Sequence, residues 1–429
     1  MKKNLFLLVL LCVSIILSSC NKDGDSVAPN DSKNDVTFYR IPLDEALKNA
    51  DHIFAGLEGE LSRGKTRRLA SVKILGGNTT ASRSVDTDRQ VDTAFYLVNY
   101  EGAGFALLSA DRRLNNLVYA ISEEGTLDLA DTVENKGLAM YMQMLRCEVD
   151  YKLGAVNQDL SSRVTLPGLN GDFSTPYYET ISIGIYSKKG PYNVNRKWDQ
   201  LAPFNKYCYT VSGQQAPVGC VAVATGMIMA HHQWPNSVGG YSLNWSEINK
   251  VQKGGEGFVT GDDHTARLLS ILGRSEYLDM SYGVNESGAN SRNVPRTLRK
   301  LGYTCSEVVP FDVDAIVQHY ESSNNPIYMR GNAGYDRDTK EYYNGHAWML
   351  DGVLVIKYVY KRQPTAPEET AMGKYIYCNW GWKGDANGWY TYWEFLTTRG
   401  PEFTEIDQPK TNGSWQFFWN FEVIMNISR

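Results

Sequence analysis

Histidine and cysteine are scarce in this sequence of 429 residues, and a strong excess of charge of either sign is missing. The chain has 6 histidines, 7 cysteines and a formal net charge of -5, with a pI near 5.8. A nearly balanced charge gives no electrostatic basis for binding nucleic acid. No CxxC or HxxxH spacing indicates zinc, and the adjacent His231 and His232 would point in different directions on a helix, so we expect no metal or other cofactor.

The cysteines also lack the dense, even-numbered pattern of a disulfide framework. A single pair such as Cys208 with Cys378 stays open. Hydrophobic residues make up 42% and charged residues 21%, which is typical of a globular chain with a sizeable core. The length allows two or three domains. The 27 tyrosines and 10 tryptophans concentrate in the second half and favour a rigid, β-rich region there.

The N-terminus has the features of a bacterial lipoprotein signal. Lys2 and Lys3 precede an apolar run over residues 4–17, which is too short to span a bilayer comfortably. The run ends in LSSC, which resembles a lipobox, so Cys20 is the predicted lipidation site and membrane anchor. Residues 1–20 would be the signal peptide, and the polar residues 21–37 a solvated tether. This predicts a location in the bacterial cell envelope, at the outer membrane or the surface.

The following region, residues 38–172, reads as a small α+β domain. Residues 94–100 and 104–109 are apolar, β-prone runs that form a hairpin around Glu101-Gly102-Ala103, and residues 117–121 add a strand. Residues 137–151 have apolar positions on one helical face. The turn-rich segment 167–172 predicts a linker. Beyond it, a helix after Cys220, a weaker one near residues 293–301 and a β-rich end predict two lobes with a cleft between them.

The strongest chemical signal is QQAPVGC at residues 214–220, which precedes a run of small and apolar residues. If a helix begins at Cys220, the thiol lies at the positive end of the helix dipole, beside free backbone N–H groups. That position favours the nucleophilic thiolate. On this stretch alone, a small buried core cysteine is an equally good interpretation.

His346 opens the strand-like run HAWML, which is predicted to end in a turn at Asp351-Gly352. It lies 126 residues after Cys220 in the printed numbering, near the spacing of a papain-like general base. Alone, a histidine on a strand is more often structural, and the pairing with Cys220 favours catalysis.

Two amides are candidates for supporting roles. Asn379, in NWGW, could accept the imidazole N–H and orient His346, with a nearby tryptophan or backbone group as the alternative. Gln214 could donate to the oxyanion together with the Cys220 backbone N–H, and Gln215 competes for that role.

Together these blocks resemble the streptopain family of papain-like cysteine peptidases. The matching segments include GQQAPVGCVAVATGMIMAHHQWP, MSYGVNESGANSRNVPRTLRKLGY, GHAWMLDGV and NWGWKGDANGWY, in family order across residues 190–395. The segment GFALLSADRRLNNLVYAISEEG resembles the family's pro-segment. Segments 336–343 and 357–374 are longer than in the streptococcal enzyme and could reshape the cleft.

The resemblance implies an α+β fold, with an inhibitory pro-domain at residues 38–172 and a two-lobed catalytic domain at 173–429. It implies a zymogen whose substrates are proteins or peptides, with Cys220 as nucleophile, His346 as base and Gln214 in the oxyanion hole. It also implies a cleft that prefers a hydrophobic side chain two residues before the cut. The implied lining residues are Ser287, Gly288, Gly345, Trp380 and Trp382. The alternatives are a cell-wall peptide amidase, and an inactive binding or inhibitory lipoprotein of the same fold.

Overall fold

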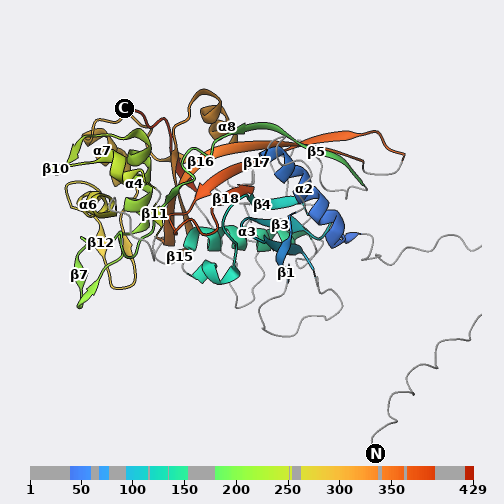
Figure 1. Ribbon diagram of the computed structural model, residues 1–429, viewed down its shortest axis with the longest axis horizontal. Coiled ribbons are helices and arrows are strands. Elements are labelled where there is room, and N and C mark those ends of the chain that lie inside the picture. The colour runs from blue at the N-terminus through green and yellow to red at the C-terminus, as the bar shows by residue number, and fades with distance from the viewer. Residues whose placement is uncertain are drawn as a thin grey trace, which may run out of the picture. The chain divides into compact units, whose positions relative to one another are not determined.

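The structure is a computed structural model (Figure 1). It describes residues 39–58, 67–76, 93–114, 116–133, 135–152, 179–250, 252–253, 262–336, 341–361, 365–391 and 421–429. The predicted signal peptide, Cys20, the tether and the linker at 167–172 therefore lie outside the described residues. In the part of the chain that is described, no helix is both long and apolar enough to cross a membrane.

The first region contains the predicted hairpin, third strand and helix. The hairpin strands pair antiparallel in register from Phe95 with Ser109 to Asn99 with Phe105. The predicted helix is confirmed as α3, whose side chains Leu138, Tyr141 and Leu145 are all buried. Three elements were not predicted, the first helix, the first strand and the short 3-10 helix. The elements of this region are α2 (Leu43–Glu58), β1 (Leu69–Leu75), β2 (Phe95–Tyr100), β3 (Phe105–Ser109), β4 (Val118–Ser122), η3 (Leu129–Val133) and α3 (Lys136–Lys152).

The second region begins with a strand and a helical lobe. Both predicted helices are present, α4 beginning at Cys220 and α7 at Asn293. The elements are β5 (Glu179–Lys189), β6 (Arg196–Lys197), β7 (Thr210–Val211), β8 (Gln214–Gln215), α4 (Cys220–His232), β9 (Ser237–Val238), β10 (Tyr241–Ser242), α5 (Trp245–Ile248), β11 (Gln252–Lys253), α6 (Asp262–Leu272), β12 (Ser281–Tyr282), β13 (Ser287–Gly288), α7 (Asn293–Lys300), β14 (Val309–Pro310) and α8 (Val313–Ser322).

A long antiparallel sheet follows and joins both regions. Its later strands are β15 (Ile327–Asp336), β16 (Glu341–Lys361), β17 (Glu369–Asn379), β18 (Gly388–Thr391) and β19 (Glu422–Ile424). Among the described strands the order is β1-β2-β3-β4-β18-β17-β16-β15-β19-β14, with β5 paired to β16. The two regions meet where β4 pairs with β18, through Ile121 with Trp389 and Ala120 with Tyr390. The sheet therefore continues from one predicted domain into the other (Figure 1).

The alternation of side chains along the strands divides the core between the two faces of this sheet. On one face, α3 buries Leu138 and Tyr141 in a cluster with Trp348, Trp380 and Tyr390. On the other face, α2 packs beside β5, where the Cα of Gly56 faces Ile185 closely enough that a Cβ would lie 2.8 Å from its Cδ1. A third cluster surrounds α4 in the helical lobe.

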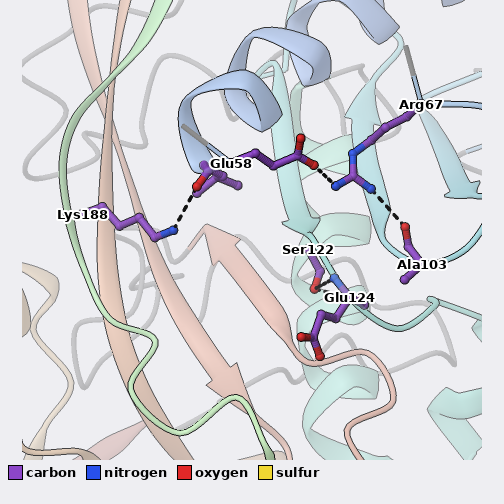
Figure 2. A network of polar contacts seen from close by, with 7 residues as sticks. Glu58, Arg67, Ala103, Ser122, Glu124 and Lys188 are labelled. Atoms are coloured by element: carbon purple, nitrogen blue, oxygen red, sulfur yellow. Dashed lines mark hydrogen bonds and ion pairs between the residues drawn. The ribbon is translucent and has the colours of Figure 1, made fainter. Parts of the chain in front are cut away.

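Polar contacts also connect α2 with its neighbours (Figure 2). Glu58, the last residue of α2, forms an ion pair with Arg67, which also donates to the Ala103 carbonyl at 3.0 Å. The Lys188 ammonium on β5 donates to the Leu57 carbonyl at 3.5 Å. These bonds satisfy polar groups at the end of α2 and join it to β5.

The prediction of a turn at Asp351-Gly352 is wrong. β16 runs through both residues, and its register with β17 shifts between Leu350 and Val353. Asp351 is fully buried and accepts two hydrogen bonds from Asn193, at 2.6 Å from the backbone N–H and 2.5 Å from the side-chain amide. Because Asn193 is distant in sequence, the local Asp-Gly pattern carries no sign of this bulge.

Candidate active site

The nucleophile candidate lies at the first residue of α4. The preceding residue, Gly219, has φ +89, and an added Cβ would lie 2.8 Å from the Ser287 carbonyl oxygen. Only glycine suits this combination of positive φ and close backbone approach. The helix therefore begins at Cys220, with the substrate-loop candidate Ser287 directly beside it.

The start of α4 directs backbone donors at the sulfur. Gly219 supplies no side-chain cap, so the first N–H groups of the helix stay available. Burial raises the pKa of the Cys220 thiol, whereas hydrogen bonding by the backbone N–H of Ala347, the nearby Lys136 ammonium and the N–H groups of Val221 and Cys220 act to lower it. Because burial is the largest cause, the thiol stays protonated at neutral pH in this structure.

His346 lies on β16, immediately before Ala347. Since the Ala347 N–H reaches the sulfur, the fold brings the two predicted catalytic residues to one place. The imidazole Nε2 lies 3.3 Å from the Trp380 carbonyl oxygen, and the ring stacks on Trp348 with centroids 5.9 Å apart. Donation from Nε2–H to that carbonyl would leave Nδ1 free for proton exchange with the thiol.

The structure does not bring the Asn379 side chain to His346. Its amide donates to the Arg196 carbonyl at 2.9 Å, and its Oδ1 accepts from the Gly381 N–H at 3.2 Å. The group on the imidazole is the backbone carbonyl of the next residue, Trp380. Asn379 therefore supports the turn that presents this carbonyl, and the orienting contact is made by a backbone group, the alternative that the sequence left open.

The first turn of α3 covers the pair. Asn135 caps this helix through its Oδ1, which accepts from the Leu138 N–H at 3.0 Å. An added Cβ on Gly137 would lie 2.5 Å from the Trp380 ring and 2.9 Å from Cδ2 of His346. The helix backbone thus packs directly on the imidazole, and a substrate cannot reach it in this arrangement.

The same turn changes the electrostatics of the pair. Burial lowers the pKa of His346 to about 4, the Trp380 carbonyl acts in the opposite direction, and the Lys136 ammonium lowers it further. Lys136 also forms an ion pair with Glu286 at 2.5 Å. With α3 in place, both pKa shifts favour a neutral thiol on Cys220 and a neutral imidazole on His346. The ionised form that catalysis needs is disfavoured.

Sequence reasoning missed Lys136 and Gly137 as residues of this site. The only local signal is Asn-Lys-Gly at the start of an amphipathic helix, which predicts a helix N-terminus and says nothing about its partner. Their role depends on contacts with His346 and Glu286, more than a hundred residues later in the chain.

The other predicted site residues differ in their exposure. Gln214 is exposed on β8, whereas Gln215 donates its amide to the Cys208 carbonyl, which leaves Gln214 as the freer of the two for the oxyanion. Gly288 has open space where a Cβ would point, and Gly345 lies opposite Asn332 in the register of β15 and β16. Trp380 is fully buried and Trp382 half-buried.

Cys208 and Cys378 are the disulfide candidates of the sequence, and His231 and His232 are adjacent near the end of α4. Cys208 and Cys378 are free thiols, so the disulfide that the sequence left open is not formed here. The rings of His231 and His232 contact each other at 5.0 Å. Within the described residues, no group of three or more potential metal ligands is present.

The two long segments near His346 form ordered strands where they are described. Residues 357–361 extend β16 and residues 369–374 begin β17, and the two pair from Lys357 with Met372 to Tyr360 with Glu369. The segment 357–374 therefore lengthens the β16–β17 hairpin where it is described. β5 pairs with the same part of β16.

Comparison with known proteins identifies relatives of this arrangement. Residues 198–260 and 238–390 match the model of the Peptidase C10 family. The chain is 24% identical to streptopain from Streptococcus pyogenes over 332 residues, 69% of this chain and 73% of streptopain. It is 26% identical over 349 residues to the thiol protease/hemagglutinin PrtT from Porphyromonas gingivalis, covering 72% of this chain and 36% of that protein.

Solved structures from Prevotella intermedia give a weaker match. A prointerpain A fragment aligns with a TM-score of 0.49 and 18% identity, covering 80% of this chain and 96% of the fragment. Active interpain A, a cysteine protease, aligns with a TM-score of 0.38 and 18% identity, covering 56% and 95%.

Proposed function

The chain is a cysteine peptidase of the Peptidase C10 family, and we propose that it is made as an inactive precursor of a secreted endopeptidase. The observation that carries this proposal is the position of Cys220. Its sulfur meets backbone N–H groups from the start of α4 and from Ala347, next to His346, under a helix of the preceding region. These contacts support Cys220 as nucleophile and His346 as base, with the first turn of α3 covering them in the precursor.

The proposed reaction is acyl transfer through a thioester. The Cys220 sulfur attacks the peptide carbonyl, and His346 takes the thiol proton and gives it to the leaving amine. Water then hydrolyses the thioester with His346 as base. Orientation of the imidazole by the Trp380 carbonyl fixes which nitrogen faces the sulfur.

The oxyanion would be stabilised by the Cys220 backbone N–H and the Gln214 amide. Because Gln215 is engaged with Cys208, Gln214 is the better candidate. Loss of one such donor reduces kcat by roughly a hundredfold or more, with substrate binding largely kept. We assign substrate binding to Ser287, Gly288 and Gly345, with Trp380 and Trp382 as a wall, and a preference for a hydrophobic side chain two residues before the cut.

Latency is assigned to residues 38–172. Contact of Gly137 with His346 and Trp380 closes the cleft, and the neutral thiol and imidazole keep the nucleophile weak. Cleavage between α3 and β5, followed by departure of α3, would open the site and return water to the pair.

We place the precursor in the bacterial cell envelope, anchored through a lipid on Cys20. The support is the LSSC sequence after an apolar run. Cys20→Ala should move the precursor from the membrane fraction to the soluble fraction. A wild-type precursor that is soluble before any proteolysis would contradict the anchor.

The test of the proposed activity is hydrolysis of casein by the processed enzyme. Cys220→Ala should abolish it, because the nucleophile is gone while the fold loses only one sulfur atom. Cys305→Ala is the matched control, since Cys305 is also a half-buried free thiol and lies outside the site. Casein hydrolysis by a folded, processed Cys220→Ala protein at the wild-type rate would overturn the proposal.

The two alternatives give different results in the same assays. A cell-wall amidase would cut purified peptidoglycan and leave casein intact. An inactive binding protein would cut neither and would not react with a thiol-directed epoxide.

A further inference from the structure

Two hairpins meet beside the nucleophile. The β7–β8 hairpin carries Gln214 and leads into α4 through residues 216–219. The β12–β13 hairpin carries Ser287 and Gly288, and its Ser287 carbonyl lies against Gly219. Both hairpins therefore belong to the rim of the proposed cleft, on the side of α4 where Figure 1 shows β7 and β12.

A pair of tyrosine rings joins the two hairpins. Tyr209 precedes β7, Tyr282 ends β12, and their centroids lie 5.3 Å apart at an interplanar angle of 58°. Tyr282 is fixed from two sides, by a hydrogen bond with the Cys208 thiol and by pairing with Ser287 across the ladder. The Tyr209 carbonyl accepts from the Ala216 N–H at 3.0 Å. Both rings therefore belong to hydrogen-bonded hairpins.

Tyr209 is nevertheless exposed to 66%. A large ring that is held in place and left in water provides apolar contact area to a ligand at a low cost in side-chain entropy. Tyr282 is paired with Ser287 across the β12–β13 ladder, so the two side chains lie on the same face of this hairpin. A peptide bound along that face, beside Ser287, would thus pass beside the two rings.

We propose that Tyr209 and Tyr282 form a substrate subsite for a large apolar or aromatic side chain, located beyond the position two residues before the cut. The subsite rests on the proposed peptidase function and adds a second determinant of specificity to it. The occupant is a side chain of the substrate, because Tyr282 shares its ladder face with Ser287, whose carbonyl lies against Gly219 beside the proposed nucleophile. Through Ser287 and Gly219, the rings are held in a fixed place relative to Cys220.

The test compares processed enzymes, each made from the full-length chain, on matched peptides. The peptides are identical except for Phe or Ala at one position, three residues before the cut in one pair and four in a second pair. Wild-type kcat/KM should favour Phe by about tenfold at one of these positions, the effect of burying one ring against aromatic partners. Tyr209→Ala should reduce this ratio to near one, and Tyr209→Phe should keep it.

Tyr186→Ala is the control, because Tyr186 is exposed to 68% on β5 and should leave the ratio unchanged. The subsite is overturned if wild type shows no preference at either position, or if Tyr209→Ala keeps the full preference. Failure of the wild-type enzyme to cut any of the peptides would instead contradict the proposed function.

Discussion

At the scale of single residues, Gly137 determines how closely α3 approaches the catalytic pair. Alanine normally stabilises a helix relative to glycine by about 1 kcal/mol. Here its Cβ would overlap the Trp380 ring, at 2.5 Å, and press on His346. We therefore expect Gly137→Ala to move the helix off the site and to give the uncut precursor measurable activity on a small fluorogenic peptide.

The control for this change is Gly184→Ala on β5, where a Cβ would meet nothing within 4 Å. It should leave the precursor latent. A Gly137→Ala precursor that is as inactive as wild type would show that the contact does not decide latency.

The pKa of His346 predicts how the packing of α3 on the catalytic pair depends on pH. The covered imidazole has a pKa of about 4, and because burial is the largest cause, we expect departure of α3 to move it towards its ordinary value of about 6.5. Between these values the uncovered form binds more protons, so a falling pH favours uncovering, by up to about 3 kcal/mol near pH 4. The protection factors of the α3 amides in a Cys220→Ala precursor, which are exchange rates corrected for the base-catalysed intrinsic rate, should therefore fall as the pH falls from 6.5 towards 4.

Replacing His346 with Gln in the same precursor should remove most of this pH dependence. If the protection factors of the α3 amides are the same at pH 7 and pH 4.5 in the His346-containing protein, the titration of His346 does not control whether α3 stays on the site.

Local sequence motifs single out Cys220 and His346, and the fold brings them together. Their roles as nucleophile and base remain predictions. The sequence left a backbone group open as the orienting partner of His346 and could not single out the Trp380 carbonyl, because a backbone group has no signature of its own. Gly137 could not be found either, since its importance comes from rings distant in sequence.

At the scale of elements, one ion pair joins α3 to the β12–β13 hairpin. Lys136 and Glu286 are separated by 2.5 Å, with side-chain exposures of 36% and 76%, so the pair contributes at most about 1 kcal/mol and is sensitive to salt. Lys136→Glu should therefore weaken latency several-fold. The charge swap Lys136→Glu with Glu286→Lys should restore it, as measured by the peptide activity of the uncut chain at low ionic strength.

Reversal of the exposed pair Arg299 and Glu307 should have no effect on latency, because it lies on α7 and the segment that follows it. Failure of the swap to restore latency would mean that Lys136 acts only through its charge near Cys220 and His346.

Secondary structure was predictable where apolar residues were periodic or continuous. α3 follows a helical period, α4 and the strands β2 to β4 are continuous apolar runs, and their predicted ranges agree with the structure to within a few residues. β1 lies at an edge of the sheet with a mostly exposed surface, so it has no apolar face for the sequence to show. The course of β16 through Asp351 depends on Asn193, a partner that no local pattern names.

At the scale of the whole molecule, the two regions share their cores. Trp389 and Tyr390 of β18 are fully buried, and β4, α2 and α3 supply part of their surroundings. The boundary predicted at residues 172 and 173 remains a prediction about the cut. The turn-rich segment 167–172 indicated a boundary in the sequence. It could not indicate how much apolar surface the two regions bury against each other.

This shared surface predicts that the first region, made alone as residues 38–172, inhibits the processed enzyme at micromolar concentration or below. Leu145→Asp should abolish the inhibition, because it places an unpaired charge among the buried residues of α3. Lys48→Asp on the exposed side of α2 is the control and should inhibit like wild type. A wild-type domain that folds and does not inhibit would contradict the latency model.

The pairing of β4 with β18 has a consequence for timing. Hydrolysis of one peptide bond between α3 and β5 breaks none of the hydrogen bonds between these strands, so cutting and dissociation are separate events. Once the chain is cut, rebinding becomes bimolecular and depends on dilution. At high local concentration near the cell, the cut first region would stay bound to the enzyme. Enzyme molecules that diffuse away would lose it, so dilution would be the last step of activation.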